Sequence, residues 1–180
     1  MKQTKFWMTT LIALLCSLTA SAHDFEVDGI YYNITSSANQ TVGVTYQGTS
    51  YSFYDEYSGT VTIPSAVTYN SKTYSVTSIG AEAFRRCNSL VSVTILEGTT
   101  IIGDYAFYGC SSLESITIPN SVTKINNYAF GYCISLSSIT IPESVMSINK
   151  ETFRDCKSLT SVTISNSVTS IGSNAFGVCI

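Results

Sequence analysis

The cysteines are the first residues whose type and spacing could do chemistry. They recur at intervals of 23 residues, as Cys87, Cys110, Cys133, Cys156 and Cys179. An exported protein can form disulfides, and strands stacked about 4.8 Å apart would place these residues within the roughly 4.4–6.8 Å that a disulfide tolerates. However, five cysteines cannot all pair internally, and one fixed position in every repeat is typical of a small buried residue. We favour free, buried thiols over disulfide bridges.

Metal binding and catalysis find less support in the sequence. No Cys-x-x-Cys pair occurs, and His23 is the only histidine, so a zinc site is disfavoured. Catalysis needs convergent acid, base or nucleophilic groups, and the chain has no glycine-rich phosphate loop and no paired carboxylates in a fixed register. We therefore expect no metal, no cofactor and no enzymatic activity.

Tyrosine and arginine side chains form the second group of candidate residues. They lie beside repeated phenylalanines, at positions where the residue type varies from repeat to repeat and the fold does not dictate it. Both residue types are enriched at binding hot spots, although they could also be ordinary surface residues. The predicted partner-binding residues are Tyr105, Tyr108, Tyr128, Tyr132, Arg85, Arg86 and Arg154. The phenylalanines themselves, such as Phe84, keep their place while their neighbours vary, which indicates a core position rather than a binding stripe.

A repeated structural unit must position these candidates, because phenylalanine, isoleucine and leucine positions also recur every 23 residues. The repeated positions are Phe84, Phe107, Phe130, Phe153 and Phe176; Ile79, Ile102, Ile125, Ile148 and Ile171; Leu90, Leu113, Leu136 and Leu159; and Ile95, Ile118, Ile141 and Ile164. The sequence therefore predicts a leucine-rich-repeat solenoid of stacked coils.

One unit, residues 113–133, shows what each part of a coil should do. Ile116 and Ile118 alternate with polar residues, the period of a strand with one buried face, and Pro119 should end that strand. Val122 and Ile125 predict a short extended or turn segment on the opposite side. Residues 127–130 are long enough for one helical or 3₁₀ turn. The fold class is thus a solenoid with a parallel β-sheet on one face and short turns, 3₁₀ turns or one-turn helices elsewhere.

The outward strand positions form a regular array of hydroxyl groups. Its members are Ser92, Thr94, Ser115, Thr117, Ser138, Thr140, Ser161 and Thr163. A solvated sheet is the simplest interpretation. A flat surface for glycans, or for ice, is the alternative, but the serines dilute the threonine ranks that ice binding would use.

The N-terminal segments differ from the repeats. Residues 1–22 resemble a secretory signal peptide, with Lys2 and Lys5, an apolar stretch and a small-residue cleavage site at 20–22. Cys16 raises a lipoprotein signal as an alternative, although the leucines before it argue against one. Residues 23–75 carry strand signals without the period and should form a β-rich cap, and residues 76–180 should form the solenoid. No segment is long enough to span a membrane.

The charge pattern excludes nucleic acid as a partner. The net charge is −3, only 12% of residues are charged, and no basic tract exists. Removal of the signal peptide with its two lysines makes the charge more negative still. We expect a monomer.

The repeat resembles that of the BspA-type leucine-rich repeat family of surface proteins from Bacteroides-like bacteria. The resemblance covers about residues 60–180 and is clearest at Val168-Thr-Ser-Ile-Gly172, with Ala175-Phe176 and Cys179. Residues 27–32 resemble the leader of such proteins. The chain departs from the pattern at 96–98 and at Thr99, where valine is usual, and it stops inside a repeat at Ile180.

This resemblance implies an exported or cell-surface protein that binds host or microbial extracellular proteins or glycans, as an adhesion-type module. It implies no catalytic residues. The alternative is a structural spacer, or a truncated fragment of a larger surface protein without binding activity of its own. Five coils at about 4.8 Å give a stack of roughly 24 Å, which is short for a spacer, so binding is favoured.

Overall fold

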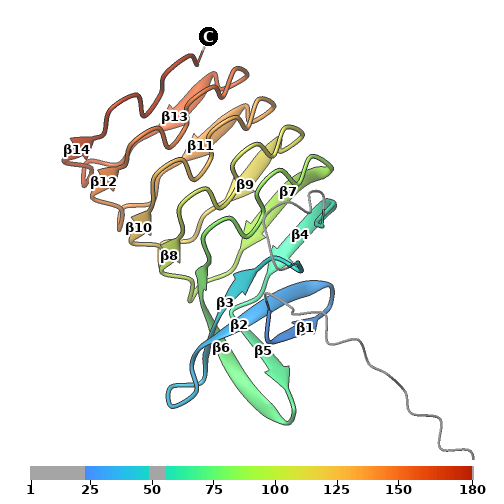
Figure 1. Cartoon of the computed structure of the whole chain (residues 1–180). Coiled ribbons are helices and arrows are strands. Elements are labelled where there is room, and N and C mark those ends of the chain that lie inside the picture. Colours follow the sequence, from blue (N-terminus) through green and yellow to red (C-terminus); the bar gives the residue numbers. More distant parts are fainter. Residues whose placement is uncertain (1–22, 49–55, 180) are drawn as a thin grey trace, which may run out of the picture.

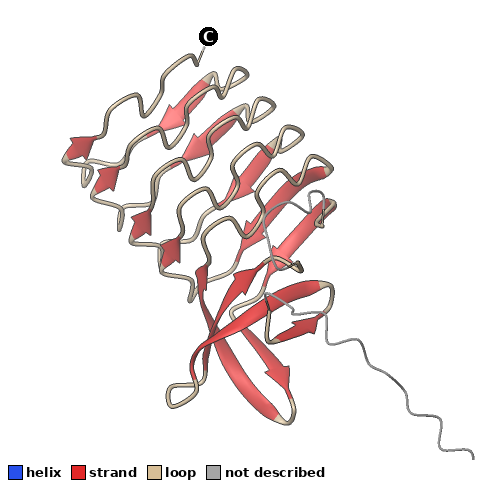
Figure 2. Cartoon of the chain, viewed as in Figure 1, coloured by secondary structure: helices blue, strands red, loops and turns tan. Residues whose placement is uncertain are grey.

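The computed structural model of the chain describes residues 23–48 and 56–179. The predicted signal peptide, with Cys16, lies outside these residues. Within them the chain forms strands joined by turns and loops, with no helix (Figure 2). The strands are β1 (Phe25–Val27), β2 (Ile30–Ser36), β3 (Thr41–Thr45), β4 (Gly59–Ile63), β5 (Ala66–Tyr69), β6 (Lys72–Ile79), β7 (Leu90–Ile95), β8 (Ile101–Ile102), β9 (Ser115–Thr117), β10 (Lys124–Ile125), β11 (Ser138–Thr140), β12 (Ser147–Ile148), β13 (Ser161–Thr163) and β14 (Ser170–Ile171).

The coils stack so that each strand lies beside its equivalent in the next coil (Figure 1). One face carries the parallel strands β4, β7 and β9 and, further along, the parallel pair β11–β13. Ile116 pairs with Val93, and Val162 with Ile139, in the 23-residue register. Ile139 is buried, whereas the residues on either side of it are exposed. The predicted leucine-rich-repeat solenoid with a parallel sheet on one face is therefore confirmed.

The opposite face of the stack carries a second set of short parallel strands. Ile125 in β10 pairs with Ile102 in β8, and Ile171 in β14 pairs with Ile148 in β12. Both alternatives that the sequence left open for this segment are observed: a turn at 120–121, in which the Val122 N–H donates to the Pro119 carbonyl at 3.1 Å, and then the strand β10. Ile102, Ile125 and Ile148 are buried, so their coils are closed by apolar side chains from both faces, whereas Ile171 in the last coil is 57% exposed.

The N-terminal strands extend this second set into a larger sheet in the order β1-β2-β3-β6-β8-β10. The β1–β2 hairpin turns at Asp28–Gly29, where φ is 51° and 76°. A second hairpin joins β5 to β6 through Asn70–Ser71, also with positive φ. This hairpin accounts for the longer spacing between Ile63 and Ile95, because these two residues pair directly in β4 and β7.

A stack of phenylalanine rings runs along the interior of the coils. Successive rings of Phe84, Phe107, Phe130, Phe153 and Phe176 lie 4.8, 5.3, 5.4 and 5.3 Å apart and nearly parallel. Buried Tyr57 continues the stack at 4.4 Å from Phe84, and its hydroxyl donates to the Thr45 carbonyl at 2.6 Å. The assignment of the phenylalanines to the core is confirmed, and Tyr57 ties that core to the N-terminal sheet.

The cysteines form a ladder beside the phenylalanine stack, and none of the five from Cys87 to Cys179 is in a disulfide. The Cys133 Sγ–H donates to the carbonyl of Phe107, and that of Cys156 to the carbonyl of Phe130, each at 3.1 Å. Burial raises the pKa of the Cys156 thiol to about 12 and that of Cys133 well above its ordinary value. These thiols are therefore protonated side chains of the core.

The segment before each cysteine is a run of turns, so the helical and 3₁₀ alternatives predicted for residues 127–130 were wrong. In Tyr128 the backbone is left-handed, with φ at 57°. Its N–H donates to the Lys150 carbonyl of the next coil at 3.0 Å, and the Phe130 N–H donates to the Thr152 carbonyl at 2.9 Å. Because these N–H groups point along the stack toward the next coil, they cannot close a helical turn within their own.

Thr99 is a buried polar residue in an apolar position of the coil. It stands where the following coils have Val122 and Val145. Its side chain is 0% exposed, and its Oγ1 has no hydrogen-bond partner. A buried hydroxyl without a partner costs about 1–3 kcal/mol.

Replacement of this threonine by valine is expected to stabilise the protein. Thr99→Val keeps the shape of the side chain and should raise the free energy of unfolding, measured by urea denaturation, by about 1 kcal/mol. The matched control is Thr152→Val, because Thr152 is equally buried but its Oγ1 donates to the Asn149 carbonyl at 2.8 Å. That variant should lose about 1 kcal/mol. Shifts of the same sign in both variants would contradict this explanation.

Candidate functional site

The seven predicted binding residues lie on the turn segments around the buried phenylalanines, in four consecutive coils. We call this surface the tyrosine–arginine face; it comprises Arg85, Arg86, Tyr105, Tyr108, Tyr128, Tyr132 and Arg154. Hydrogen bonds between neighbouring turns hold the coils in register. The Arg86 N–H donates to the Tyr108 carbonyl at 2.8 Å, and the Tyr132 N–H to the Arg154 carbonyl at 2.7 Å. The turns therefore present these side chains in regular columns along the stack.

Two of these columns consist of residues in the left-handed backbone conformation. The first column is Glu82, Tyr105, Tyr128, Glu151 and Asn174, and the second is Arg86, Gly109, Tyr132, Asp155 and Val178. Glycine and asparagine are the residues that adopt this conformation most readily. The sequence predicted contact residues here but not their backbone conformation. The appearance of Gly109 and Asn174 in these columns is the signal that could have revealed it.

The four tyrosine rings contact one another across two coils. Tyr105 and Tyr128 stack at 4.7 Å with an interplanar angle of 7°. Tyr108 meets Tyr105 edge-on at 5.4 Å and lies 5.2 Å from Tyr132. Such aromatic pairs contribute about 0.5–1.5 kcal/mol beyond their buried area. The rings thus form one connected aromatic patch, in which Tyr132 is 38% exposed.

Arg85 flanks this patch at its N-terminal side. Its guanidinium carbon lies 5.6 Å from the ring centroids of both Tyr105 and Tyr108, within the range of cation–π attraction. Its Nη1 donates to the Glu82 carboxylate at 2.9 Å. Desolvation raises the pKa of both Tyr105 and Tyr108. Their hydroxyls therefore stay protonated at neutral pH and can donate hydrogen bonds.

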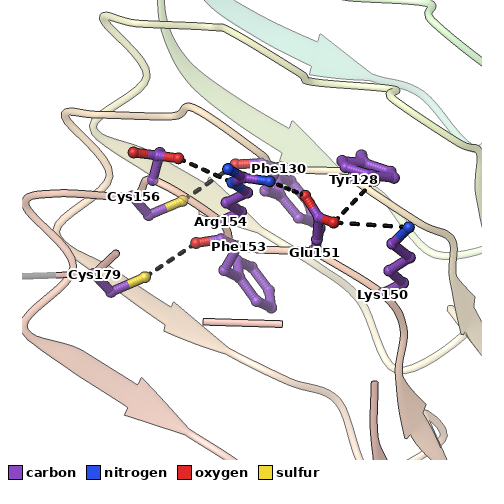
Figure 3. A network of polar contacts seen from close by, with 9 residues as sticks. Tyr128, Phe130, Lys150, Glu151, Phe153, Arg154, Cys156 and Cys179 are labelled. Carbon is purple, nitrogen blue, oxygen red and sulfur yellow. Dashed lines mark hydrogen bonds and ion pairs between the residues drawn. The ribbon is translucent and has the colours of Figure 1, made fainter. Parts of the chain in front are cut away.

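A network of charges flanks the patch at its other side (Figure 3). The Glu151 side chain is only 7% exposed, and its Oε2 accepts a hydrogen bond from Arg154 at 2.6 Å. Its Oε1 accepts one from the Tyr128 hydroxyl at 3.0 Å and lies 3.8 Å from Lys150 Nζ. Arg154 also donates to Asp155 at 3.2 Å. The hydrogen bond to the nearly buried Glu151 carboxylate thus holds the Tyr128 hydroxyl, and with it the Tyr128 ring, in one orientation.

The Glu151→Gln substitution is expected to destabilise the protein at pH 7. The hydrogen bond from Arg154 is the main reason that the pKa of Glu151 is lowered. A carboxyl group whose pKa is lower in the folded state contributes stability above its unfolded pKa of about 4.3, and that contribution is lost as the pH falls through the folded value. The urea midpoint of Glu151→Gln should therefore be lower than that of the parent at pH 7, and the two should converge as the pH falls from about 5 to about 3.

The control for this prediction is Glu114→Gln, which removes one negative charge at an exposed position. It should change the urea midpoint less than Glu151→Gln does at pH 7. A Glu151→Gln midpoint equal to that of the parent at pH 7 would show that the network does not stabilise the fold.

Three residues of this network were absent from the predicted set, although they lie in the same variable turns: Lys150, Glu151 and Asp155. The sequence contained one sign of their role. Glu82 and Arg85 are three residues apart, and Glu151 and Arg154 repeat that spacing at equivalent positions, where both pairs form ion pairs. Arg154 therefore forms ion pairs with the carboxylates of Glu151 and Asp155. Tyr132, by contrast, is 38% exposed.

Other candidate sites offer less. The strand hydroxyls, such as Ser115 and Thr117, are exposed on the sheet face. Within residues 23–48 and 56–179, no three His, Cys, Asp or Glu side chains gather in a group that could hold a metal ion. The same residues include no apolar helix of membrane-spanning length.

Comparison with known proteins gives concordant results for sequence and structure. Residues 49–180 match the BspA type leucine-rich repeat region, in six copies. No curated protein matches the chain.

Several solved structures of bacterial leucine-rich repeat proteins are similar to this chain. The T. pallidum leucine-rich repeat protein is 30% identical with a TM-score of 0.72, and the match covers 86% of this chain and 67% of that one. A leucine-rich repeat protein from Bacteroides ovatus is 33% identical with a TM-score of 0.67, over 87% and 45% of the two chains. A leucine-rich cell surface protein from Faecalibacterium prausnitzii is 30% identical with a TM-score of 0.57, over 85% and 45%.

This chain spans less than half of the last two proteins. The repeat match, the 23-residue register and the stacked parallel coils agree with one another. The chain belongs to the BspA-type leucine-rich repeat family.

Proposed function

We propose that this protein is an exported or cell-surface binding module that contacts host or microbial extracellular proteins or glycans through the tyrosine–arginine face. The observation that carries the proposal is the connected patch of Tyr105, Tyr108, Tyr128 and Tyr132. Tyrosine combines a large apolar ring with a hydrogen-bonding hydroxyl, and few rotatable bonds need to be fixed when it binds. A surface of four such rings suits recognition.

The backbone conformation supports the same proposal. Tyr105, Tyr128 and Tyr132 have φ values of 56°, 57° and 60°. A residue other than glycine in this region costs roughly 1–2 kcal/mol. Glycine or asparagine would therefore serve the fold at lower cost. The presence of large aromatic side chains at three such positions is explained if the rings have a task at the surface.

Binding fits the chemistry of the face better than catalysis does. Its groups are arginines, which stay protonated, and tyrosines; the pKa of Tyr105 and that of Tyr108 are raised by desolvation. None of these groups is an effective general base at neutral pH. The similarity to a leucine-rich cell surface protein of F. prausnitzii supports a location outside the cell.

The proposal predicts retention of the full chain on an extracellular ligand. We would measure binding of the purified chain to immobilised matrix proteins, mucins and glycans, in parallel with the triple variant Tyr105→Ala, Tyr128→Ala, Tyr132→Ala. Loss of hot-spot aromatics typically costs at least about 2 kcal/mol each, so the variant should lose most of its binding. Its unfolding transition should remain cooperative. A parent chain that binds nothing would favour the spacer alternative and overturn the proposal.

A further inference from the structure

The first strand of the parallel sheet, β4, has a partner strand on one side only. Within residues 23–48 and 56–179, β4 pairs with β7 alone (Figure 1). The Ile63 carbonyl accepts a hydrogen bond from the Leu96 N–H at 3.0 Å, so it points toward the next coil. Because backbone groups alternate in direction along a strand, the N–H and C=O groups of Thr60 and Thr62 point away from β7. They form an open sheet edge.

This edge lacks the features that usually protect an exposed strand. Such strands commonly carry charged residues, proline or a bulge that twists the edge away. The strand β4 reads Gly-Thr-Val-Thr-Ile, with no charged residue and no proline. The one register shift in its pairing places the extra residue, Val91, in β7. The sequence of β4 therefore suits the addition of another strand.

A cavity of about 400 Å³ lies beside this edge. Thr60, Val61 and Thr62 line one part of it, and residues 27–30 of the β1–β2 hairpin line another. Val61 is only partly buried, whereas Val93, its partner in the next coil, is 2% exposed. The N-terminal strands thus cover the first coil incompletely and leave apolar surface next to the open edge.

The cavity is negatively charged. Asp28 and Glu56 are the charged residues that line it. The Glu56 carboxylate accepts hydrogen bonds from the Gln47 and Gly48 N–H groups at 2.8 and 3.4 Å, which hold it in place. Tyr32 also lines the cavity; it is 0% exposed, and its hydroxyl has no hydrogen-bond partner among the described residues. A cationic group entering here would meet two carboxylates and an unpartnered hydroxyl.

We infer that an extended segment of a partner protein, carrying a basic side chain, adds to β4 as a further strand. Its backbone would pair with Thr60 and Thr62, and its lysine or arginine side chain would lie in the cavity against Asp28. A small apolar molecule would fill the cavity but leave the edge unpaired, and an acidic peptide would meet like charges. The site shares no residue with the tyrosine–arginine face, so the inference does not depend on the proposed function.

The first test uses the full chain and the peptide acetyl-Thr-Val-Lys-Val-Thr-amide, with binding followed by NMR. At saturation, hydrogen exchange of the Thr60 and Thr62 amides should slow at least about tenfold, because new strand hydrogen bonds protect them. Norleucine in place of the peptide lysine keeps the aliphatic chain but removes the charge. It should weaken binding about three- to fivefold, as expected for a partly exposed ion pair.

Methylation of the peptide backbone tests strand addition itself. Adjacent amides of an extended strand face opposite directions, so only one of two neighbouring N–H groups can pair with β4. N-methylation of the lysine amide and of the following valine amide should therefore have unequal effects: one should abolish binding, and the other should leave it nearly unchanged.

Variants of the protein test the cavity. Asp28→Asn should weaken binding of the lysine peptide about three- to fivefold and leave the norleucine peptide unaffected. The fold should tolerate it, because asparagine readily adopts the left-handed conformation of this position, where φ is 51°. Glu26→Gln is the matched control, since it removes a charge from the same hairpin at a residue that does not line the cavity. Tyr32→Phe should weaken binding without lowering the urea midpoint, because it removes a hydroxyl that has no partner.

The inference is overturned if the peptide does not slow exchange at Thr60 and Thr62, if the two methylated peptides bind alike, or if Asp28→Asn and Glu26→Gln have equal effects. Slow exchange at Thr60 and Thr62 that depends on protein concentration without peptide would assign the edge to a second copy of the chain and also overturn it. The triple tyrosine variant should bind the peptide as the parent does, so this inference and the proposed function can fail separately.

Discussion

Phe130→Ala is expected to lower the free energy of unfolding by about 3–5 kcal/mol, as large truncations in a core do. The Phe130 ring is 0% exposed and stacks on Phe107 at 5.3 Å and on Phe153 at 5.4 Å. Removal of the ring would leave a cavity between two coils that depend on each other for their buried surface. The measurement is urea denaturation of the full chain, followed by circular dichroism.

The position of the ring along the stack supplies the control for this prediction. Phe176 is only partly buried and stacks on one neighbour, Phe153 at 5.3 Å. Phe176→Ala should therefore cost clearly less than Phe130→Ala. Equal losses in the two variants would contradict the role of the stack as a continuous core, as would a loss below about 1 kcal/mol at Phe130.

Alkaline pH is expected to destabilise the protein by several kcal/mol. Burial raises the pKa of Cys156 to about 12 and that of Cys133 well above its ordinary value, whereas an unfolded cysteine titrates near 8.5. A group whose pKa is higher in the folded state contributes its full stability below its unfolded pKa and loses it as the pH rises toward the folded one. Each such thiol therefore removes about 1.4 kcal/mol per pH unit. Between about pH 9 and pH 11, Cys156 alone should remove roughly 2–3 kcal/mol.

Cys156→Ser separates this effect from the titration of other groups. The serine hydroxyl can donate to the same Phe130 carbonyl but does not ionise in this range. The variant should lose stability more slowly with pH, by about 1.4 kcal/mol per unit. Tyr32 and Tyr57 are also buried, and their raised pKa values destabilise in the same direction at higher pH, so the difference between parent and variant is the informative quantity. Identical slopes would exclude the thiol as a cause.

Much of the fold could be predicted because the repeat multiplies each signal. The alternation around Ile116 predicts the strand, and the fixed places of phenylalanine and cysteine predict the core. An Asp-Gly pair favours a tight hairpin turn, and the β1–β2 hairpin turns at Asp28–Gly29. These features depend on local residue type and spacing, and the repeat shows the same types at the same spacing in several coils.

The turn segments could not be predicted in the same detail because contacts between coils determine them. The left-handed conformation at Tyr128 is imposed by hydrogen bonds to the next coil and contradicts the usual preference of tyrosine. The position of Glu151 in a nearly buried ion network depends on partners such as Tyr128, 23 residues away. The 23-residue step indicates that the predicted binding residues lie in neighbouring coils. Only the three-dimensional structure shows that the tyrosines form an aromatic patch and that Arg154 belongs to a charge network.

The proposed binding role of the tyrosine–arginine face is tested most directly by equilibrium binding of matched variants to one extracellular ligand. The triple variant at Tyr105, Tyr128 and Tyr132 should bind at least about tenfold more weakly than the parent, in keeping with the cost of truncating hot spots. Replacement of the exposed sheet residues Thr117 and Thr140 by alanine should leave the dissociation constant unchanged. The opposite pattern, with the sheet variant impaired and the tyrosine variant intact, would place the binding surface on the hydroxyl-lined strands and contradict this assignment.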